Sequence, residues 1–163
     1  MIIFMPENKP DNKNDKRKLR EFYFQFFFHI NNPLFIKGFK TYSAANAQDL
    51  LQDQLSDFMV TLEQKMTIDE QKQTLKFFIN LLNHYDECHA HFATYCPTWK
   101  PERLSKVDHS VLLLAFYELS FEPTPFKVVI NEAIEIGKKF GTKESPDFIN
   151  AVLDHFHSDH SST

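Results

Sequence analysis

The stretch SKVDHSVLLLAFY, residues 105–117, decides how the rest of the chain is interpreted. It begins with a helix-start pattern, because Ser105 is a favoured N-cap residue and Asp108 stands where a capping box places Glu or Gln. The seven residues from Val111 to Tyr117 contain no polar group except the tyrosine hydroxyl. A helix that is apolar all round is buried on most of its sides. We therefore predict a central helix that other helices enclose.

Two more helices are predicted after this stretch. The break Glu122–Pro125 offers Thr124 as an N-cap and Pro125 as a first helical residue, and Gly141 is expected to end that helix. Ser145-Pro146-Asp147 repeats the start signal for a last helix. The apolar positions of the first of the two have helical spacing: Phe126, Val129, Ile130, Ala133, Ile136, Gly137 and Phe140.

The N-terminal half is also predicted to be helical. Helices are expected from about 15 to Asn31-Asn32-Pro33, over about 44–65, and from the capping box Thr67–Glu70 through Tyr85, with a connector over 34–42. The run FYFQFFF (22–28) has a strand-like composition without alternation, so its pattern leaves the conformation open. We predict an all-α, compact single-domain bundle of about six or seven helices. Residues 15–157 form the domain, 1–14 a mobile segment and 158–163 a flexible tail.

Composition excludes several classes of protein. The chain has 163 residues, of which 18 are Phe and only 3 are Gly. So few glycines allow neither the G-x-G-x-x-G nor the G-x-x-x-x-G-K-[ST] phosphate loop. The longest aromatic run is too short for a membrane span, and the first residues lack the pattern of a signal peptide. Because two cysteines are too few for a disulfide framework, we expect a cytoplasmic protein with no membrane partner.

Charge is distributed unevenly along the chain. Residues 1–40 carry a net charge of +4, whereas residues 41–163 carry −8. Four cations, Lys16, Arg17, Lys18 and Arg20, gather at the start of the first predicted helix. Such a basic segment on an acidic body indicates an acidic partner, and RNA phosphates are the natural candidate. The alternative is a solvated helix start, which opposes the helix dipole at a small cost.

One spacing is typical of metal sites. His84, Cys88 and His91 stand at i, i+4 and i+7, on one face of a predicted helix. No C-x-x-C pair accompanies them, and no motif supports Cys88 as a nucleophile. We therefore favour a polar helix face with one buried cysteine over a metal site or a catalytic pair.

The C-terminal third contains a long ordered series of motifs. They are Trp99–Asp108, Tyr117–Leu119, Pro125–Glu135, Lys138–Gly141, Ser145–Asn150 and Val152–Asp154. This series resembles the NusB family of bacterial transcription antitermination factors, and Arg17, Arg20-Glu21 and Gln25 resemble its arginine-rich first helix. The resemblance implies an all-helical protein that is not an enzyme and uses no cofactor or metal. It also implies binding to boxA-type ribosomal RNA leaders with ribosomal protein NusE, and contact with RNA polymerase through other Nus factors.

The resemblance also implies site residues. Lys16, Arg17, Lys18, Arg20 and Lys127 are expected to contact phosphates, and Phe28 and Phe148 to stack on bases. Asp108, Glu118, Phe126 and Glu144 are expected at or near the NusE surface. Each of these assignments has a structural alternative. Phe28 and Phe148 are equally suited to core packing, and Asp108 and Glu144 to helix capping.

This chain departs from the family pattern at several positions. Leu19, Phe22 and Tyr23 replace small residues of the first helix, so we expect that helix to pack differently. His109 and Leu113 stand where the family has basic residues, which leaves any contact made there in doubt. Two other functions stay open. One is an RNA-guiding domain of a ribosomal RNA methyltransferase system, and the other is a helical scaffold that binds only protein.

Overall fold

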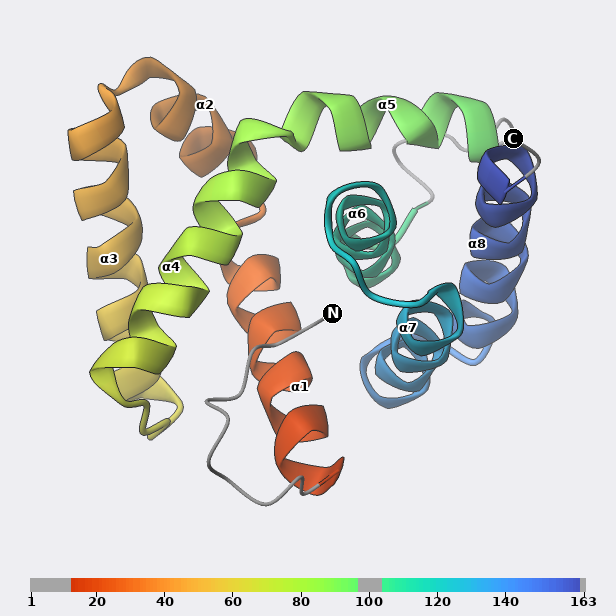
Figure 1. Ribbon diagram of the computed structural model, residues 1–163, viewed down its shortest axis with the longest axis horizontal. Helices are drawn as coiled ribbons and strands as arrows, with labels where there is room; N and C mark the ends of the chain where they lie inside the picture. Colours follow the sequence, from red (N-terminus) through yellow and green to blue (C-terminus); the bar gives the residue numbers. More distant parts are fainter. Residues whose placement is uncertain (1–12, 97–103, 162–163) are drawn as a thin grey trace.

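The computed structural model describes residues 13–96 and 104–161, and within these ranges the chain forms eight α-helices and no strand (Figure 1). The N-terminal helices are α1 (Lys13–Ile30), α2 (Pro33–Thr41), α3 (Ala44–Thr61) and α4 (Ile68–Asn83). The C-terminal helices are α5 (Tyr85–Tyr95), α6 (Lys106–Phe121), α7 (Phe126–Phe140) and α8 (Ser145–Ser161). The predicted fold class, all-α, is confirmed.

Helix α6 is the centre of the molecule, as its sequence predicts. Every residue from Ser110 to Glu118 is buried, and α6 packs against α1, α5, α7 and α8. Figure 1 shows α6 end-on, with α5, α7 and α8 around it. The Oγ atom of Ser105 caps the helix by accepting the backbone N–H of Asp108 at 3.0 Å. A local capping signal and an apolar run therefore suffice to define this element.

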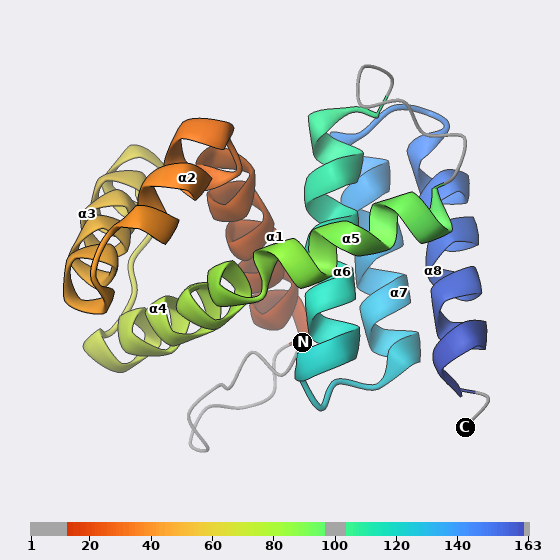
Figure 2. The ribbon, with the colours of Figure 1, turned by 90° about the horizontal axis from the view of Figure 1, so that it is seen from above.

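The phenylalanine run adopts a helix because two layers of side chains enclose it. In Figure 2, α2–α4 lie on one side of α1 and α6–α8 on the other, and α5 crosses between the two groups. Phe26 packs its ring against Phe58 of α3 and Phe78 of α4, while Phe24 meets Phe140 of α7. A helix that is buried on opposite faces needs apolar residues around most of its circumference, and the Phe-rich sequence supplies them.

The predicted connector over 34–42 is wrong, because this segment is largely helix α2. The Oδ1 atom of Asn32 accepts the backbone N–H of Phe35 at 2.9 Å, and Pro33 occupies the first turn. Asn-Pro therefore ends α1 and also begins α2, since proline at the first helical position loses no intrahelical hydrogen bond. Ile36 and Phe39 anchor the helix in the core.

Three other boundaries differ from prediction. The helix expected to continue through Tyr85 ends at Asn83, and α5 starts one residue after His84, so with α2 the described helices number eight rather than six or seven. Pro125 is the N-cap of α7 rather than its first residue, and no side chain caps that end. Helix α8 continues past residue 157 to Ser161. The expected mobile segment falls mainly on residues 1–12, and the first half of the Trp99–Asp108 motif on 99–103; both lie outside the described residues.

Candidate nucleic-acid interface

The four cations at the start of α1 differ in how much of each side chain water can reach. Lys16 is partly exposed and Lys18 is exposed. The side chain of Arg17 is 44% exposed, whereas that of Arg20 is only 12% exposed. From the sequence alone, these four residues are predicted to have the same role. The structure separates Lys18, which is exposed, and Arg17, whose side chain is nearly half exposed, from Arg20, whose side chain lies mostly within the fold.

Arg17 and Arg20 share one carboxylate, that of Glu132 on α7. The Glu132 Oε1 atom lies 3.8 Å from a guanidinium nitrogen of Arg17 and 3.3 Å from one of Arg20. Arg20 also lies near Glu118 of α6, which is only 3% exposed. Burial raises the pKa of Glu118, and the positive charge of Arg20 opposes that rise. Arg20 therefore links α1 to α6 and α7, and no sequence signal pairs residues about a hundred positions apart.

Helices α1 and α7 meet along a seam that begins at this shared carboxylate. One turn further along α1, Lys139 Nζ donates to Glu21 Oε2 at 2.6 Å. The rings of Phe24 and Phe140 follow, with centroids 5.1 Å apart. The order of contacts shows that the two helices run in the same direction. The cations on this face therefore lie in a row along the α1 axis rather than in one cluster.

At the end of α1, a lysine from α6 covers Phe28. The Lys106 Nζ atom lies 4.4 Å from the centroid of the Phe28 ring, and that ring is half-buried against the core. An exposed cation–π contact contributes about 0.5–1 kcal/mol, whereas stacking of a base on an aromatic ring contributes about 1–3 kcal/mol. Since Lys106 is exposed, a base can displace it from the ring at a net gain.

The other two residues predicted to bind RNA lie on the C-terminal helices α7 and α8. Lys127 is exposed in the first turn of α7. Phe148 lies in the first turn of α8, half-buried against the core. Since α7 and α8 are antiparallel neighbours, these two first turns are at opposite ends of the C-terminal helices (Figure 2). Lys127 and Phe148 therefore do not form one contact surface with each other.

The four residues predicted to meet NusE also do not form one patch. Asp108 and Glu118 lie ten residues apart on α6, which is about 15 Å along a helix. Glu118 is buried, so a docked protein cannot contact it directly in this conformation. The ring of Phe126 is stacked on His157 of α8, with centroids 3.6 Å apart. Glu144 is exposed just before α8, whose start lies at the same end of the molecule as Asp108 (Figure 2).

Asp108 has an oxygen atom without a hydrogen-bond partner among the residues that the structure describes. The residue is 9% exposed, and within residues 13–96 and 104–161 nothing donates a hydrogen bond to its buried Oδ1 atom. A buried carboxylate oxygen that accepts no hydrogen bond lowers the stability of the folded protein. A carboxylate that only helps to cap a helix can stay in contact with water and avoids this cost. The atom is not accessible in this conformation, so it accepts a donor from another molecule only after the side chain or its neighbours move.

Of the two positions where this chain lacks a basic residue, one is buried and the other is half-buried. Leu113 is fully buried in α6. His109 accepts a hydrogen bond at Nδ1 from the Asn31 side chain at 3.0 Å and stacks on Phe92 at 4.6 Å. Burial lowers the pKa of His109 to about 4, and the nearby His89 adds to the effect. Neither position contributes a positive charge to the surface at neutral pH.

The Asn31 side chain connects three helices at this point. Its Nδ2 atom also donates to Ser110 Oγ at 3.0 Å, and its Oδ1 atom accepts the Tyr85 hydroxyl at 3.1 Å. These bonds join the end of α1 to α5 and α6. The sequence reasoning missed this network, because it interpreted Asn31 only as a helix terminator.

The histidine and cysteine cluster does not assemble as a metal site within the described part of the chain. No group of three His, Cys, Asp or Glu residues there is placed to hold a metal ion. His84 stacks on Phe121 of α6, and His91 contacts Phe156 of α8. Burial raises the pKa of the Cys88 thiol to about 12, which keeps it protonated and unreactive at neutral pH.

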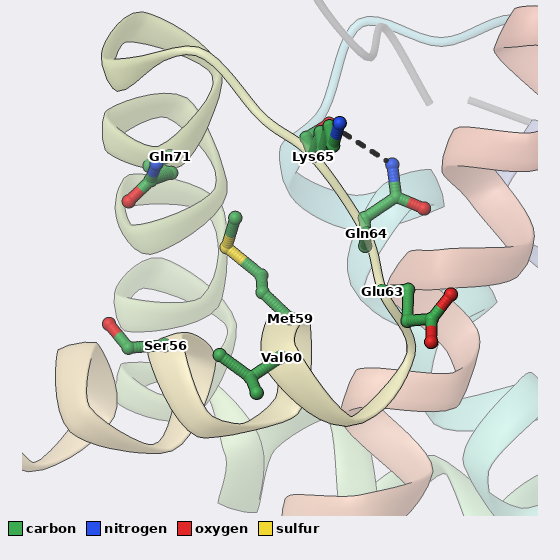
Figure 3. Close-up of a pocket in the computed structure, with 7 residues that line it drawn as sticks. All are labelled: Ser56, Met59, Val60, Glu63, Gln64, Lys65 and Gln71. Carbon is green, nitrogen blue, oxygen red and sulfur yellow. Dashed lines mark hydrogen bonds between the residues drawn. The ribbon is translucent and has the colours of Figure 1, made fainter.

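A surface hollow lies at the turn between α3 and α4, away from these residues (Figure 3). Its wall contains Ser56, Met59, Val60, Glu63, Gln64, Lys65 and Gln71. The side chains of Glu63 and Met59 point in different directions in Figure 3, and the charged members of the wall are exposed. The hollow therefore does not gather polar groups as an active site does.

In the described ranges, no helix is sufficiently long and apolar to pass through a bilayer.

Comparisons with known proteins agree with the fold and with the C-terminal motifs. Residues 17–158 match the NusB family. The chain is 37% identical over 117 residues to the transcription antitermination protein NusB of Bacillus subtilis, a match that covers 69% of this chain and 88% of the relative. It is 35% identical over 142 residues to the NusB of Agathobacter rectalis, covering 86% and 98%. The solved structure of T. maritima NusB is similar with a TM-score of 0.66 and 26% identity, over 88% of this chain and 91% of that one.

Proposed function

The chain belongs to the NusB family, and from that premise we propose that it is a non-enzymatic transcription antitermination factor that binds boxA-type RNA together with NusE. In this role it reaches RNA polymerase through other Nus factors. The observation that carries the proposal is the surface at the start of α1. There Lys18 is exposed and Lys16 and Arg17 are partly exposed, on an otherwise acidic chain.

The RNA contact is electrostatic at one end of α1 and aromatic at the other. Lys16, Arg17 and Lys18 attract phosphates, and the binding constant then falls with salt by a log–log slope of roughly −0.7 per phosphate on a single strand. Phe28 offers a ring for one base once Lys106 moves aside. Arg20 does not contact RNA in this proposal; its ion pair with Glu132 holds α1 against α7 and so keeps the RNA-binding surface in place.

The NusE contact is proposed at the end of the molecule where α6 and α8 begin. Asp108 supplies a buried acceptor that has no donor in the described part of the chain, and Glu144 supplies an exposed negative charge. Acidic groups of this kind suit a basic ribosomal protein, since they steer its approach and give a donor a buried partner. Phe126 lies at the other end of α7 and acts as a separate anchor.

The RNA assignment is tested by titrating a labelled boxA-type RNA in a polarisation assay, with and without NusE, at two salt concentrations. Replacing Lys16, Arg17 and Lys18 together by Gln is expected to flatten the log–log salt slope by about 2, the sum for three phosphates. Arg20 stays unchanged, because its replacement disturbs Glu132 and Glu118. The control is Lys72→Gln with Lys76→Gln, two exposed lysines of α4. Wild-type binding by the triple variant would refute the RNA assignment.

The NusE assignment is tested by calorimetry with purified NusE. Asp108→Asn keeps the backbone N–H that Ser105 caps, so it removes charge without removing the cap. We expect it to weaken NusE binding about thirtyfold or more, as for a buried charged contact. Asp154→Asn, an exposed change on α8, is the control. NusE binding with no effect of RNA would instead support the protein-only scaffold, and methyl transfer by the purified chain would support the methyltransferase system.

A further inference from the structure

Two exposed lysines to which the family resemblance assigns no binding role lie beside α1. Lys139 reaches α1 from α7, where it pairs with Glu21. Lys106 reaches α1 from α6, where it covers Phe28. Both lysines are exposed, and both touch the helix that begins with the basic surface. Three cations therefore follow one another along α1: its own Arg17, then Lys139 from α7, then Lys106 from α6.

The charge of these two helices sets this face apart from the rest of the protein. Residues 16–30 and 126–140 together contain seven Lys and Arg and three Glu, a net charge of +4. The whole chain carries −4, so the remaining residues carry −8. A polyanion that approaches the molecule is therefore directed to the α1–α7 face.

The geometry along α1 suits one single strand better than an isolated phosphate. From Arg17 to Phe28 the helix rises about 16 Å, which gives room for several nucleotides. Cations border this path at its start, its middle and its end, and aromatic rings lie beside the last two: Phe140 beside Lys139, and Phe28 beside Lys106. A track of alternating cations and ring faces is the usual construction of a surface for single-stranded nucleic acid.

We propose that Lys139 and Lys106 contact the phosphates of a single-stranded RNA that runs along α1 from Arg17 to Phe28. The inference rests on the proposed RNA-binding function and extends it by a path and two residues. Lys139 exchanges Glu21 for a phosphate when RNA binds. Lys106 leaves the Phe28 ring to a base and holds the adjoining phosphate.

The neighbouring residue Lys138 provides a matched control for Lys139. The two side chains are equally exposed, at 58% and 57%, and each makes one ion pair. Lys138 pairs with Glu135 on its own helix, whereas Lys139 faces α1. We expect Lys139→Gln to weaken binding of the boxA-type RNA by about three- to tenfold and to flatten the salt slope by about 0.7. Lys138→Gln is expected to change the dissociation constant less than about twofold.

A second variant separates direct contact from an indirect effect on helix packing. Glu21→Gln breaks the same ion pair but leaves Lys139 in place, so a phosphate contact predicts unchanged or tighter RNA binding. Weaker binding by Glu21→Gln would show that the pair only holds α1 against α7, and the inference would then be wrong.

Lys106 is tested in the same assay. Lys106→Gln is compared with Lys76→Gln, and the same loss of affinity and slope is expected only for the former. If wild type binds RNA and the Lys16, Arg17 and Lys18 variant weakens it, but the Lys139 and Lys106 variants match their controls, the path fails and the proposed function stands. If wild type binds no RNA with or without NusE, both fail.

Discussion

His109 is the residue whose environment departs furthest from what its position in the chain suggests. It stands beside Asp108 in the first turn of α6, where a histidine would be expected to face water, yet its ring is stacked on Phe92 and accepts a hydrogen bond from Asn31. An imidazole that accepts at Nδ1 is in its neutral form. Protonation would break the bond and place a charge in a half-buried site, so the folded state resists it.

We predict that His109 makes the protein less stable in mild acid. The unfolded chain binds a proton near the ordinary histidine pKa of about 6.5, whereas the folded chain does so only near pH 4. The free energy of unfolding therefore falls as pH drops through this window, by about 2 kcal/mol at pH 5. Urea unfolding at pH 7.5 and pH 5 should show that His109→Gln loses about 2 kcal/mol less than wild type over this interval. His29→Gln, an exposed change, should follow the wild-type curve.

Arg17 and Arg20 both pair with Glu132, but their side chains differ in how deeply they are buried. Arg20→Gln leaves Glu118 and Glu132 with less compensation inside the fold, so we expect it to lower the free energy of unfolding by about 3 kcal/mol. Arg17→Gln removes a half-exposed partner at a longer distance and should cost less than about 1 kcal/mol. Chemical unfolding of both variants at one pH decides the matter. Equal losses would contradict the supporting role given to Arg20.

At the scale of elements, the turn after α3 contains a glutamate, Glu63, in a left-handed backbone conformation that this residue type does not favour. Glu63 has a φ of 51°, the only positive value among the non-glycine residues described. The N–H of Gln64 bonds to Met59 O and that of Glu63 to Val60 O, which is the Schellman arrangement normally closed by glycine.

Glu63→Gly is therefore expected to stabilise the protein by about 0.5–1 kcal/mol, because glycine adopts a positive φ without steric cost. The same change in the middle of α3, Asp53→Gly, should destabilise it by about 1 kcal/mol. Thermal unfolding of the two variants should shift in opposite directions. A lower midpoint for Glu63→Gly would show that the side chain stabilises the turn in some other way.

Helices with their own start signals or a regular apolar spacing could be predicted from sequence, whereas α2 and the break between α4 and α5 could not. The capping box of Thr67 and Glu70 and the Ser105 cap are local features, and the structure confirms both. Helix α2 was missed because Asn-Pro signals an end and a start equally well. The candidate site depends on long-range contacts, since Arg20 of α1 lies near Glu118 of α6 and pairs with Glu132 of α7, and none of these is a neighbour of another in the chain.

At the scale of the whole molecule, α1 joins two groups of helices into one core. The Phe26 ring is fully buried and contacts Phe58 and Phe78, while Phe24 on the same helix contacts Phe140 of the C-terminal group. The large number of phenylalanines is thereby explained. A helix placed between two layers needs bulky side chains on both faces, and the small residues of the family pattern would leave space unfilled.

We therefore predict that Phe26→Ala destabilises both groups together. Loss of a fully buried phenylalanine should lower the free energy of unfolding by about 3–5 kcal/mol, whereas Phe28→Ala, at a half-buried position, should cost less than half as much. Amide hydrogen exchange tests whether the effect is shared, because the slowest amides exchange through global unfolding. In Phe26→Ala, exchange should accelerate equally in α4 and in α6. Acceleration confined to α4 would mean that the two groups unfold independently and that α1 belongs energetically to only one of them.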